Sequence, residues 1–120
     1  MLIIRASLRF IEPQITGILY IVEQEFARAG CETVVMTSGW RVHAVGQVAN
    51  SLHPKGFAAD FDSQQMSEDW NDHTWQALKV ALKDRLGDEY DVVIHGPRAH
   101  AHIEYDINRV NRKFNEAIPV

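Results

Sequence analysis

Two stretches of the chain repeat their apolar residues at the three- and four-residue spacing of an amphipathic helix. The first is predicted to begin at Pro13, which suits a first helical turn, and to end at Gly30. Its apolar positions are Ile15, Ile18, Leu19, Val22 and Phe26. The second is predicted to be capped by Ser67 and ended by Gly87. Its inward stripe is Trp75, Leu78, Leu82 and Leu86.

Short β-branched and apolar segments between and after these helices indicate strands. We predict them at residues 32–37, 57–62, 89–95 and 100–106, the last two joined by a turn at Gly96, Pro97 and Arg98. Residues 38–54 have no sustained period and are predicted to form a long loop, and such loops are often functional. The order helix, strand, strand, helix, hairpin predicts one α+β domain over residues 1–120. Its sheet is expected to be small, mostly antiparallel and packed by helices.

The composition allows an enzyme without requiring one. The chain has 120 residues, a net charge of −4 and a single cysteine, Cys31. The negative charge argues against a dedicated nucleic-acid binder, and one cysteine excludes an intrachain disulfide and a Cys-based zinc finger. The opening apolar run is interrupted by Arg5 and Arg9, so neither a signal peptide nor a membrane span is predicted. We expect a monomer that is made in the cytoplasm and binds neither nucleic acid nor membrane.

Histidine and carboxylate side chains gather at two places in the sequence, and the first lies around His53 and Asp60. These two residues are separated by Gly56, which permits a close turn, and by small alanines that leave room beside a site. Imidazole and carboxylate are ligands that Zn²⁺ accepts, and three protein ligands with an open position are typical of a catalytic zinc site. We therefore predict that His53 and Asp60 converge on one ion.

The second place is the predicted strand that carries His100, His102 and Glu104. Side chains alternate along a strand, so these three should share one face while the intervening apolar residues point to the other. The apolar set should face the core, which leaves two imidazoles and a carboxylate in line on the polar face. One imidazole can bind a metal ion while its neighbour, about 7 Å along the strand, reaches a substrate.

These two motifs resemble those of a known peptidase family. The pattern Ser-x-His-x-x-Gly-x-Ala-x-Asp, followed by a C-terminal His-x-His, is similar to that of the zinc D-alanyl-D-alanine carboxypeptidases and L-alanyl-D-glutamate endopeptidases. The resemblance covers residues 37–106, over half of the chain. It implies the fold that this family shares with the amino-terminal signalling domain of hedgehog proteins. It also implies that Zn²⁺ is bound by His53, Asp60 and His102.

The resemblance implies roles for three further residues. The family has an upstream Ser-Gly-aromatic-Arg segment whose arginine binds the substrate carboxylate, and here this arginine is Arg41. Ser51, the serine of the motif, is expected to donate a hydrogen bond to the substrate. His100, the first histidine of the pair, is expected beside the metal, where it stabilises the transition state.

One departure from the family concerns the general base. Many relatives have an acidic residue or a histidine three residues before one of the paired histidines, where this chain has Pro97 and Ala99. His95, displaced by what resembles a two-residue insertion, is the predicted base, because a neutral imidazole can accept the proton. Glu104 is the second candidate, and it could equally be the partner of a zinc-bound histidine.

The function implied by the resemblance is zinc-dependent hydrolysis of a peptide bond in the peptidoglycan stem peptide, either D-Ala-D-Ala or L-Ala-D-Glu. Without a predicted signal peptide or wall-binding module, the chain resembles a phage or prophage lysis enzyme. Such a protein reaches the cell wall after release by another protein or as part of a virion. Two alternatives stay open: a zinc-binding but non-catalytic binding or virion-structural module of the same fold, and a metal-free scaffold.

Overall fold

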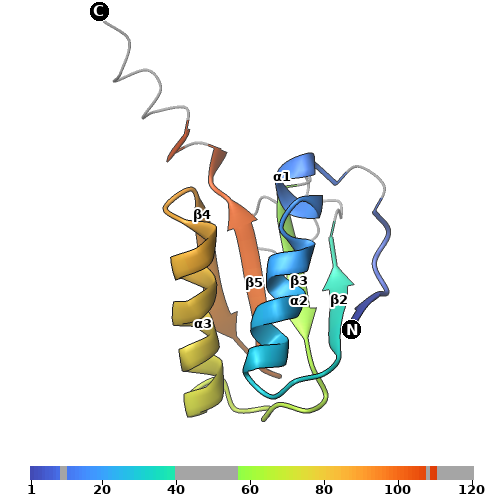
Figure 1. Ribbon diagram of the computed structural model, residues 1–120, viewed down its shortest axis with the longest axis vertical. Helices are drawn as coiled ribbons and strands as arrows, with labels where there is room; N and C mark the ends of the chain where they lie inside the picture. The colour runs from blue at the N-terminus through green and yellow to red at the C-terminus, as the bar shows by residue number, and fades with distance from the viewer. Residues whose placement is uncertain (9–10, 40–56, 108, 111–120) are drawn as a thin grey trace, which may run out of the picture.

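The computed structural model describes residues 1–8, 11–39, 57–107 and 109–110, and within them the chain folds into an α+β arrangement (Figure 1). The predicted α+β class is therefore confirmed, while the fold implied by the resemblance stays a prediction. The helices are α1 (Pro13–Thr16), α2 (Leu19–Arg28) and α3 (His73–Leu86). The strands are β1 (Leu2–Ile4), β2 (Val34–Ser38), β3 (Ala58–Asp62), β4 (Tyr90–His95) and β5 (His100–Tyr105). Four of these strands match the predicted ones within two residues.

The five strands form one sheet in the order β1-β2-β3-β5-β4. The pairings β2–β3, β3–β5 and β4–β5 are antiparallel, but β1 pairs with β2 in parallel. The sheet is thus mixed: the expectation was a mostly antiparallel sheet, and the parallel β1–β2 pairing is the departure from it. The reason is β1, a three-residue strand that is too short to show a period in the sequence. Long-range pairing with β2 defines it, and Arg5 N–H extends this pairing by donating to the carbonyl of Met36 at 3.0 Å.

The first predicted helix is divided into α1 and α2 by a turn at Gly17 and Ile18. The Gly17 N–H donates to the Pro13 carbonyl at 2.8 Å, and a Cβ at Gly17 would lie 2.9 Å from that same oxygen. The Ile18 N–H then reaches only three residues back, to the Ile15 carbonyl, which tightens the turn. The predicted end is confirmed, because Gly30 follows the last turn of α2 with a φ of +91°, a conformation that favours glycine.

The second predicted helix starts later than expected. Its cap is Asp72 and not Ser67, because the Asp72 carboxylate accepts a hydrogen bond from the Thr74 N–H at 2.9 Å. The Ser67 hydroxyl instead accepts from the Asp69 N–H at 3.0 Å, and this bond closes a turn before the helix. The helix ends at the predicted Gly87, which has a φ of +87°. No helix among the described residues is long and apolar enough to cross a membrane.

The helices cover one face of the sheet, where the core lies (Figure 1). Phe26 from α2 and Trp75 from α3 are fully buried and meet edge to face, with ring centroids 5.9 Å apart. The Trp75 indole N–H donates to the Ser67 carbonyl at 2.7 Å, so this large side chain leaves no unsatisfied donor in the core. From the sheet, the buried strand residues beneath the helices include Val34, Met36, Ala59, Phe61, Val92, Ile94, Ala101 and Ile103.

One buried charge joins the two long helices. Glu25 of α2 is only 5% exposed, and its carboxylate accepts from Arg28 at 2.7 Å and from Arg85 of α3 at 3.1 Å. A buried carboxylate is costly unless it is paired and hydrogen-bonded. The two guanidinium groups supply these partners, and the pair to Arg85 fixes α3 against α2.

The cap of α3 gives the first prediction. Replacing Asp72 with Ala should lower the free energy of unfolding by about 1 kcal/mol, because the Thr74 N–H loses its acceptor. Replacing Asp72 with Asn keeps an acceptor and should cost only a few tenths of a kcal/mol. Urea unfolding followed by circular dichroism measures both. Equal losses in the two variants would show that the Asp72 charge, and not its hydrogen bond, stabilises the helix.

Candidate metal centre

The face of the sheet opposite the helices carries polar and ionisable side chains. Along β5 the predicted alternation is confirmed: Ala101, Ile103 and Tyr105 are buried, while the side chains between them are partly exposed. On β3, Ala59 and Phe61 join the core, so Asp60 and Asp62 point to the other face. The sheet therefore brings carboxylates of β3 next to imidazoles of β5.

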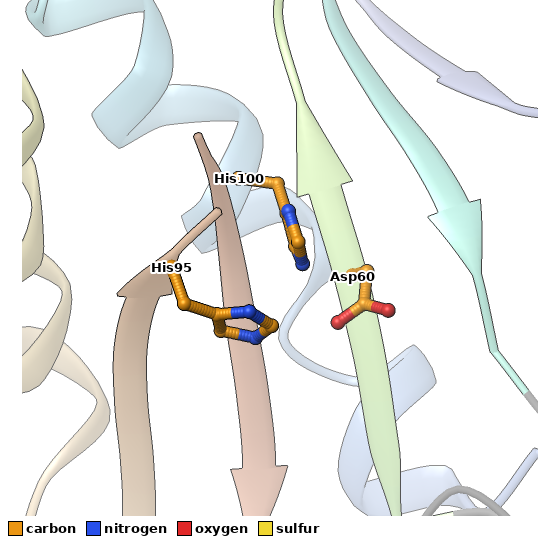
Figure 2. Close-up of side chains that lie close together, drawn as sticks. All are labelled: Asp60, His95 and His100. Carbon is orange, nitrogen blue, oxygen red and sulfur yellow. The ribbon is translucent and has the colours of Figure 1, made fainter. Parts of the chain in front are cut away.

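Three of these side chains converge at one end of the sheet. Asp60 comes from β3, His95 from the end of β4 and His100 from the start of β5, and Figure 2 shows all three pointing toward one another. His95 and His100 are direct partners in the β4–β5 ladder, with ring centroids 4.2 Å apart. One ligand atom from each of the three residues lies within 4.8 Å of the others. This set is called the Asp60–His95–His100 cluster below.

A backbone hydrogen bond orients the His100 ring. Its Nδ1 lies 2.9 Å from the Arg98 carbonyl oxygen, which can only accept a hydrogen bond. In the neutral ring Nδ1 therefore carries the proton, and the lone pair is on Nε2. Metal-binding histidines are commonly fixed in this way, with one nitrogen donating to a carbonyl and the other free to bind an ion.

His102 lies deeper, between two carboxylates. Its Nδ1 is 2.9 Å from Asp60 Oδ1, and its Nε2 is 3.7 Å from Glu104 Oε2. Burial lowers the pKa of His102, but the hydrogen bonds and charges of Asp60 and Glu104 outweigh it and raise the pKa to about 9. Without a metal ion, His102 is an imidazolium at neutral pH, and both of its nitrogens face carboxylates.

His95 has the opposite electrostatic setting. Burial lowers its pKa, and the neighbouring His100 lowers it further. A lowered pKa keeps the imidazole neutral at physiological pH. Neutral imidazole is the form that binds a metal ion or accepts a proton, so the setting suits a metal ligand as well as the predicted general base.

The Asp60–His95–His100 cluster opens into a pocket of about 390 Å³. The other residues that line it are Thr37, Ser38, Asp62 and Arg98. The Arg98 guanidinium bridges Asp62 at 3.2 Å and Glu68 at 3.4 Å, so its charge is already compensated by two carboxylates. Arg98 and Thr37 carry no motif in the sequence, and only the sheet and the β4–β5 turn bring them to the pocket.

The predicted site residues divide into two groups. Asp60, His95, His100, His102 and Glu104 lie together on the polar face of β3, β4 and β5. Arg41, Ser51 and His53 lie outside the described residues, so their predicted roles as carboxylate clamp, substrate donor and zinc ligand stay predictions. Among the first group, Glu104 contacts His102 and does not line the pocket.

The donor set fits a divalent transition metal. Two imidazoles and one carboxylate are one of the ligand sets of catalytic zinc sites, which leave a coordination position open. The sulfur ligands that would favour a structural site or an iron–sulfur cluster are absent from the described part of the cluster, and Cys31 lies in the core. The chemistry of the residues present therefore agrees with the predicted Zn²⁺.

Comparison of the chain with protein-family models, with curated protein sequences and with solved structures gave no match. The geometry of the site and the motifs of the sequence are therefore the basis of the functional argument.

The pKa of His102 gives the second prediction, for protein kept free of metal with a chelator. Because the folded pKa is about 9 and the unfolded value about 6.5, protonated His102 stabilises the fold fully below pH 6.5. This stabilisation should disappear as pH rises through 9. Urea unfolding between pH 6 and 10 should show the loss in wild type and not in His102→Asn. An equal decline in both proteins would mean that His102 is not the titrating group.

Proposed function

We propose that the protein is a zinc-dependent peptidase that hydrolyses a peptide bond of the peptidoglycan stem peptide. The observation that carries the proposal is the Asp60–His95–His100 cluster, in which two histidines and a carboxylate from three strands place ligand atoms within 4.8 Å of one another. A pocket large enough for part of a peptide chain lies directly beside these atoms. Such convergent polar groups in a pocket are typical of a catalytic site.

We assign the zinc ligands to Asp60, His95 and His100. His102 has a different role in this assignment: it holds Oδ1 of Asp60 by a hydrogen bond, which orients the carboxylate. Glu104 faces the other nitrogen of His102. The ligand set implied by the sequence resemblance is instead His53, Asp60 and His102, with His95 as general base and His100 beside the transition state. The two sets share Asp60 alone: in the present assignment His95 and His100 take the places that His53 and His102 have in the other set.

The substrate class rests on the sequence. The Ser-x-His-x-x-Gly-x-Ala-x-Asp and His-x-His motifs resemble those of enzymes that cut D-Ala-D-Ala or L-Ala-D-Glu bonds. The pocket agrees with a peptide substrate, because the Ser38 hydroxyl on its wall can donate a hydrogen bond to a peptide carbonyl. The Thr37 hydroxyl donates to the Asp60 carbonyl at 3.5 Å and can accept from a peptide N–H. A bound Zn²⁺ would act as a Lewis acid there, polarising the scissile carbonyl and acidifying a water molecule. The protein's part is to hold its ligands in place through the Arg98 carbonyl and His102.

A second candidate function is supported by the position of Glu104. If His95 binds zinc, a separate group must accept the proton during hydrolysis, and Glu104 faces His102 and not the pocket. A zinc-binding module without hydrolytic activity, acting as a binding or virion-structural protein, fits this arrangement. Measurement of turnover separates the two functions.

The third prediction concerns zinc binding. The purified protein should bind about one Zn²⁺ per chain, measured by metal analysis and by competition with a chromophoric chelator. His95→Ala and His100→Ala should lose the ion. His102→Gln should weaken binding by about 10- to 100-fold, the usual cost of removing a group that orients a ligand.

His73→Ala is the matched control, because His73 starts α3 on the helical side of the sheet. It should bind zinc as wild type does. The reverse order, with zinc kept in His95→Ala and lost in His102→Gln, would favour the ligand set implied by the resemblance.

The fourth prediction concerns turnover. The zinc-loaded protein should release free amino groups from purified peptidoglycan, a chelator should stop the reaction, and added Zn²⁺ should restore it. Asp60→Asn should abolish turnover because it weakens a ligand. If His95 is a general base and not a ligand, His95→Ala should retain zinc and lose roughly 10²- to 10⁴-fold in kcat.

Glu104→Gln tests the remaining candidate base. A mild effect that follows zinc affinity is expected, because Glu104 contacts His102. Collapse of turnover with zinc retained would give the role of base to Glu104. Full zinc occupancy without hydrolysis of any stem peptide would contradict the peptidase and support the binding module.

A further inference from the structure

The pocket beside the Asp60–His95–His100 cluster continues across the sheet toward β1. A second pocket, of about 150 Å³, shares Thr37, Asp62 and Arg98 with the first. A third, of about 250 Å³, shares Arg5, Val35 and Gln64 with the second. The three pockets thus adjoin one another in a row on the face opposite the helices, and this row is here called the cross-strand groove.

The register of the sheet sets the direction of this groove. Ile3 of β1 pairs with Val35 of β2, and Val35 pairs with Asp62 of β3. Asp62 follows Phe61, the partner of Ala101, so it lies next to His100, which pairs with His95. The groove therefore runs across the strands, from β4 at one edge of the sheet to β1 at the other.

The two ends of the groove differ in charge. At the cluster end, Arg98 is compensated by Asp62 and Glu68. At the β1 end, the lining consists of Ile3, Arg5, Thr33, Val35, Gln64 and Gln65, which include one cation and no carboxylate. Arg5 forms no ion pair with any carboxylate in the described part of the chain. The β1 end is thus a positive, hydrogen-bonding surface with a planar guanidinium that can bind a carboxylate through two donors.

Distance along the groove indicates the length of ligand that it suits. Arg5 continues β1, two strands away from Asp60 on β3, and neighbouring strands are about 4.8 Å apart, which gives about 10 Å. An extended peptide advances about 3.3 Å per residue, so this span corresponds to about three residues.

We propose that the cross-strand groove binds an extended acidic peptide, with Arg5 receiving a side-chain or terminal carboxylate about three residues from the bond at the cluster. The spacing between the bound carboxylate and the cleaved bond rests on the proposed peptidase function. The preference for acidic peptides rests on the groove and Arg5 alone. It makes Arg5 a specificity-determining residue that is separate from the metal-binding residues.

Binding is tested first, without any dependence on catalysis. The probes are two fluorescein-labelled alanine-based octapeptides that differ only in carrying Glu or Gln at the same two positions, titrated with the full chain in chelator and followed by fluorescence anisotropy. Wild type should prefer the Glu peptide. Arg5→Ala should raise Kd for the Glu peptide by roughly 2- to 5-fold, because Arg5 is exposed, and leave Kd for the Gln peptide unchanged.

Two variants control for charge in general. Arg5→Glu should reverse the preference between the Glu peptide and a matched Lys peptide. Lys83→Ala removes an exposed cation from α3, on the other side of the sheet, and should change neither Kd. An Arg5→Ala variant that binds both peptides as wild type does, or a wild type that binds neither peptide, would overturn the proposal.

Hydrolysis then tests the spacing between the carboxylate that Arg5 binds and the cleaved bond. In a series of peptides whose single Glu is moved stepwise from the cleaved bond, KM should be lowest at a separation of about three residues, and Arg5→Ala should remove this minimum without changing kcat. Hydrolysis that is indifferent to Arg5 would refute the inference and leave the peptidase standing. Acidic-peptide binding through Arg5 without hydrolysis would support the groove and refute the peptidase.

Discussion

The antiparallel pairing of β3, β5 and β4 is the constraint on which the site depends. It places Asp60 opposite His102 and His95 opposite His100. A shift of one residue in either pairing would turn every side chain of that strand to the other face, taking the imidazoles into the core and the apolar residues into the pocket. The packed helices prevent such a shift, because Phe61, Ala101 and Ile103 are buried beneath them. The hydrophobic core thus fixes the positions of polar groups that it does not touch.

The carboxylate of Asp60 takes part in two interactions, the pair with His102 and the cluster with His95 and His100. It is nearly buried, so it needs a cation or hydrogen-bond donors, and His102 meets this need without a metal ion. Asp60 is also part of the cluster that His95 and His100 complete. Metal binding and the Asp60–His102 pair are therefore coupled. The negative charge of Asp60 keeps His102 protonated, and a cation bound at the cluster would compete for that same charge. At His102 the two carboxylates outweigh burial and raise the pKa, whereas at His95 burial, and then the neighbouring His100, lower it.

One face of the sheet packs against the helices, and the other carries the candidate site. α2 and α3 cover one face, joined by the Phe26–Trp75 contact and the buried Glu25 ion pairs. The other face carries the cluster and the cross-strand groove, whose lining comes from all five strands and from the segments next to them. Because the strands pack against the helices on the opposite face, the distance between Arg5 and the cluster is set by strand spacing. This fixed distance would therefore select ligands of a matching length.

By itself, the sequence determined the elements that have a clear period: α3 with its stripe from Trp75, the alternation of β5, and glycine ends at Gly30 and Gly87. These are local properties, because side-chain periodicity and backbone preference act within a few residues. It also placed Asp60, His95 and His100 among the predicted site residues, and the sheet brings these three together, while their roles stay predictions. Tertiary structure alone decided that β1 joins the sheet in parallel and that His102 pairs with Asp60, which brings the carboxylate of β3 beside the imidazoles of β5. These features depend on contacts between residues far apart in the chain, and no local pattern encodes which strand lies beside which.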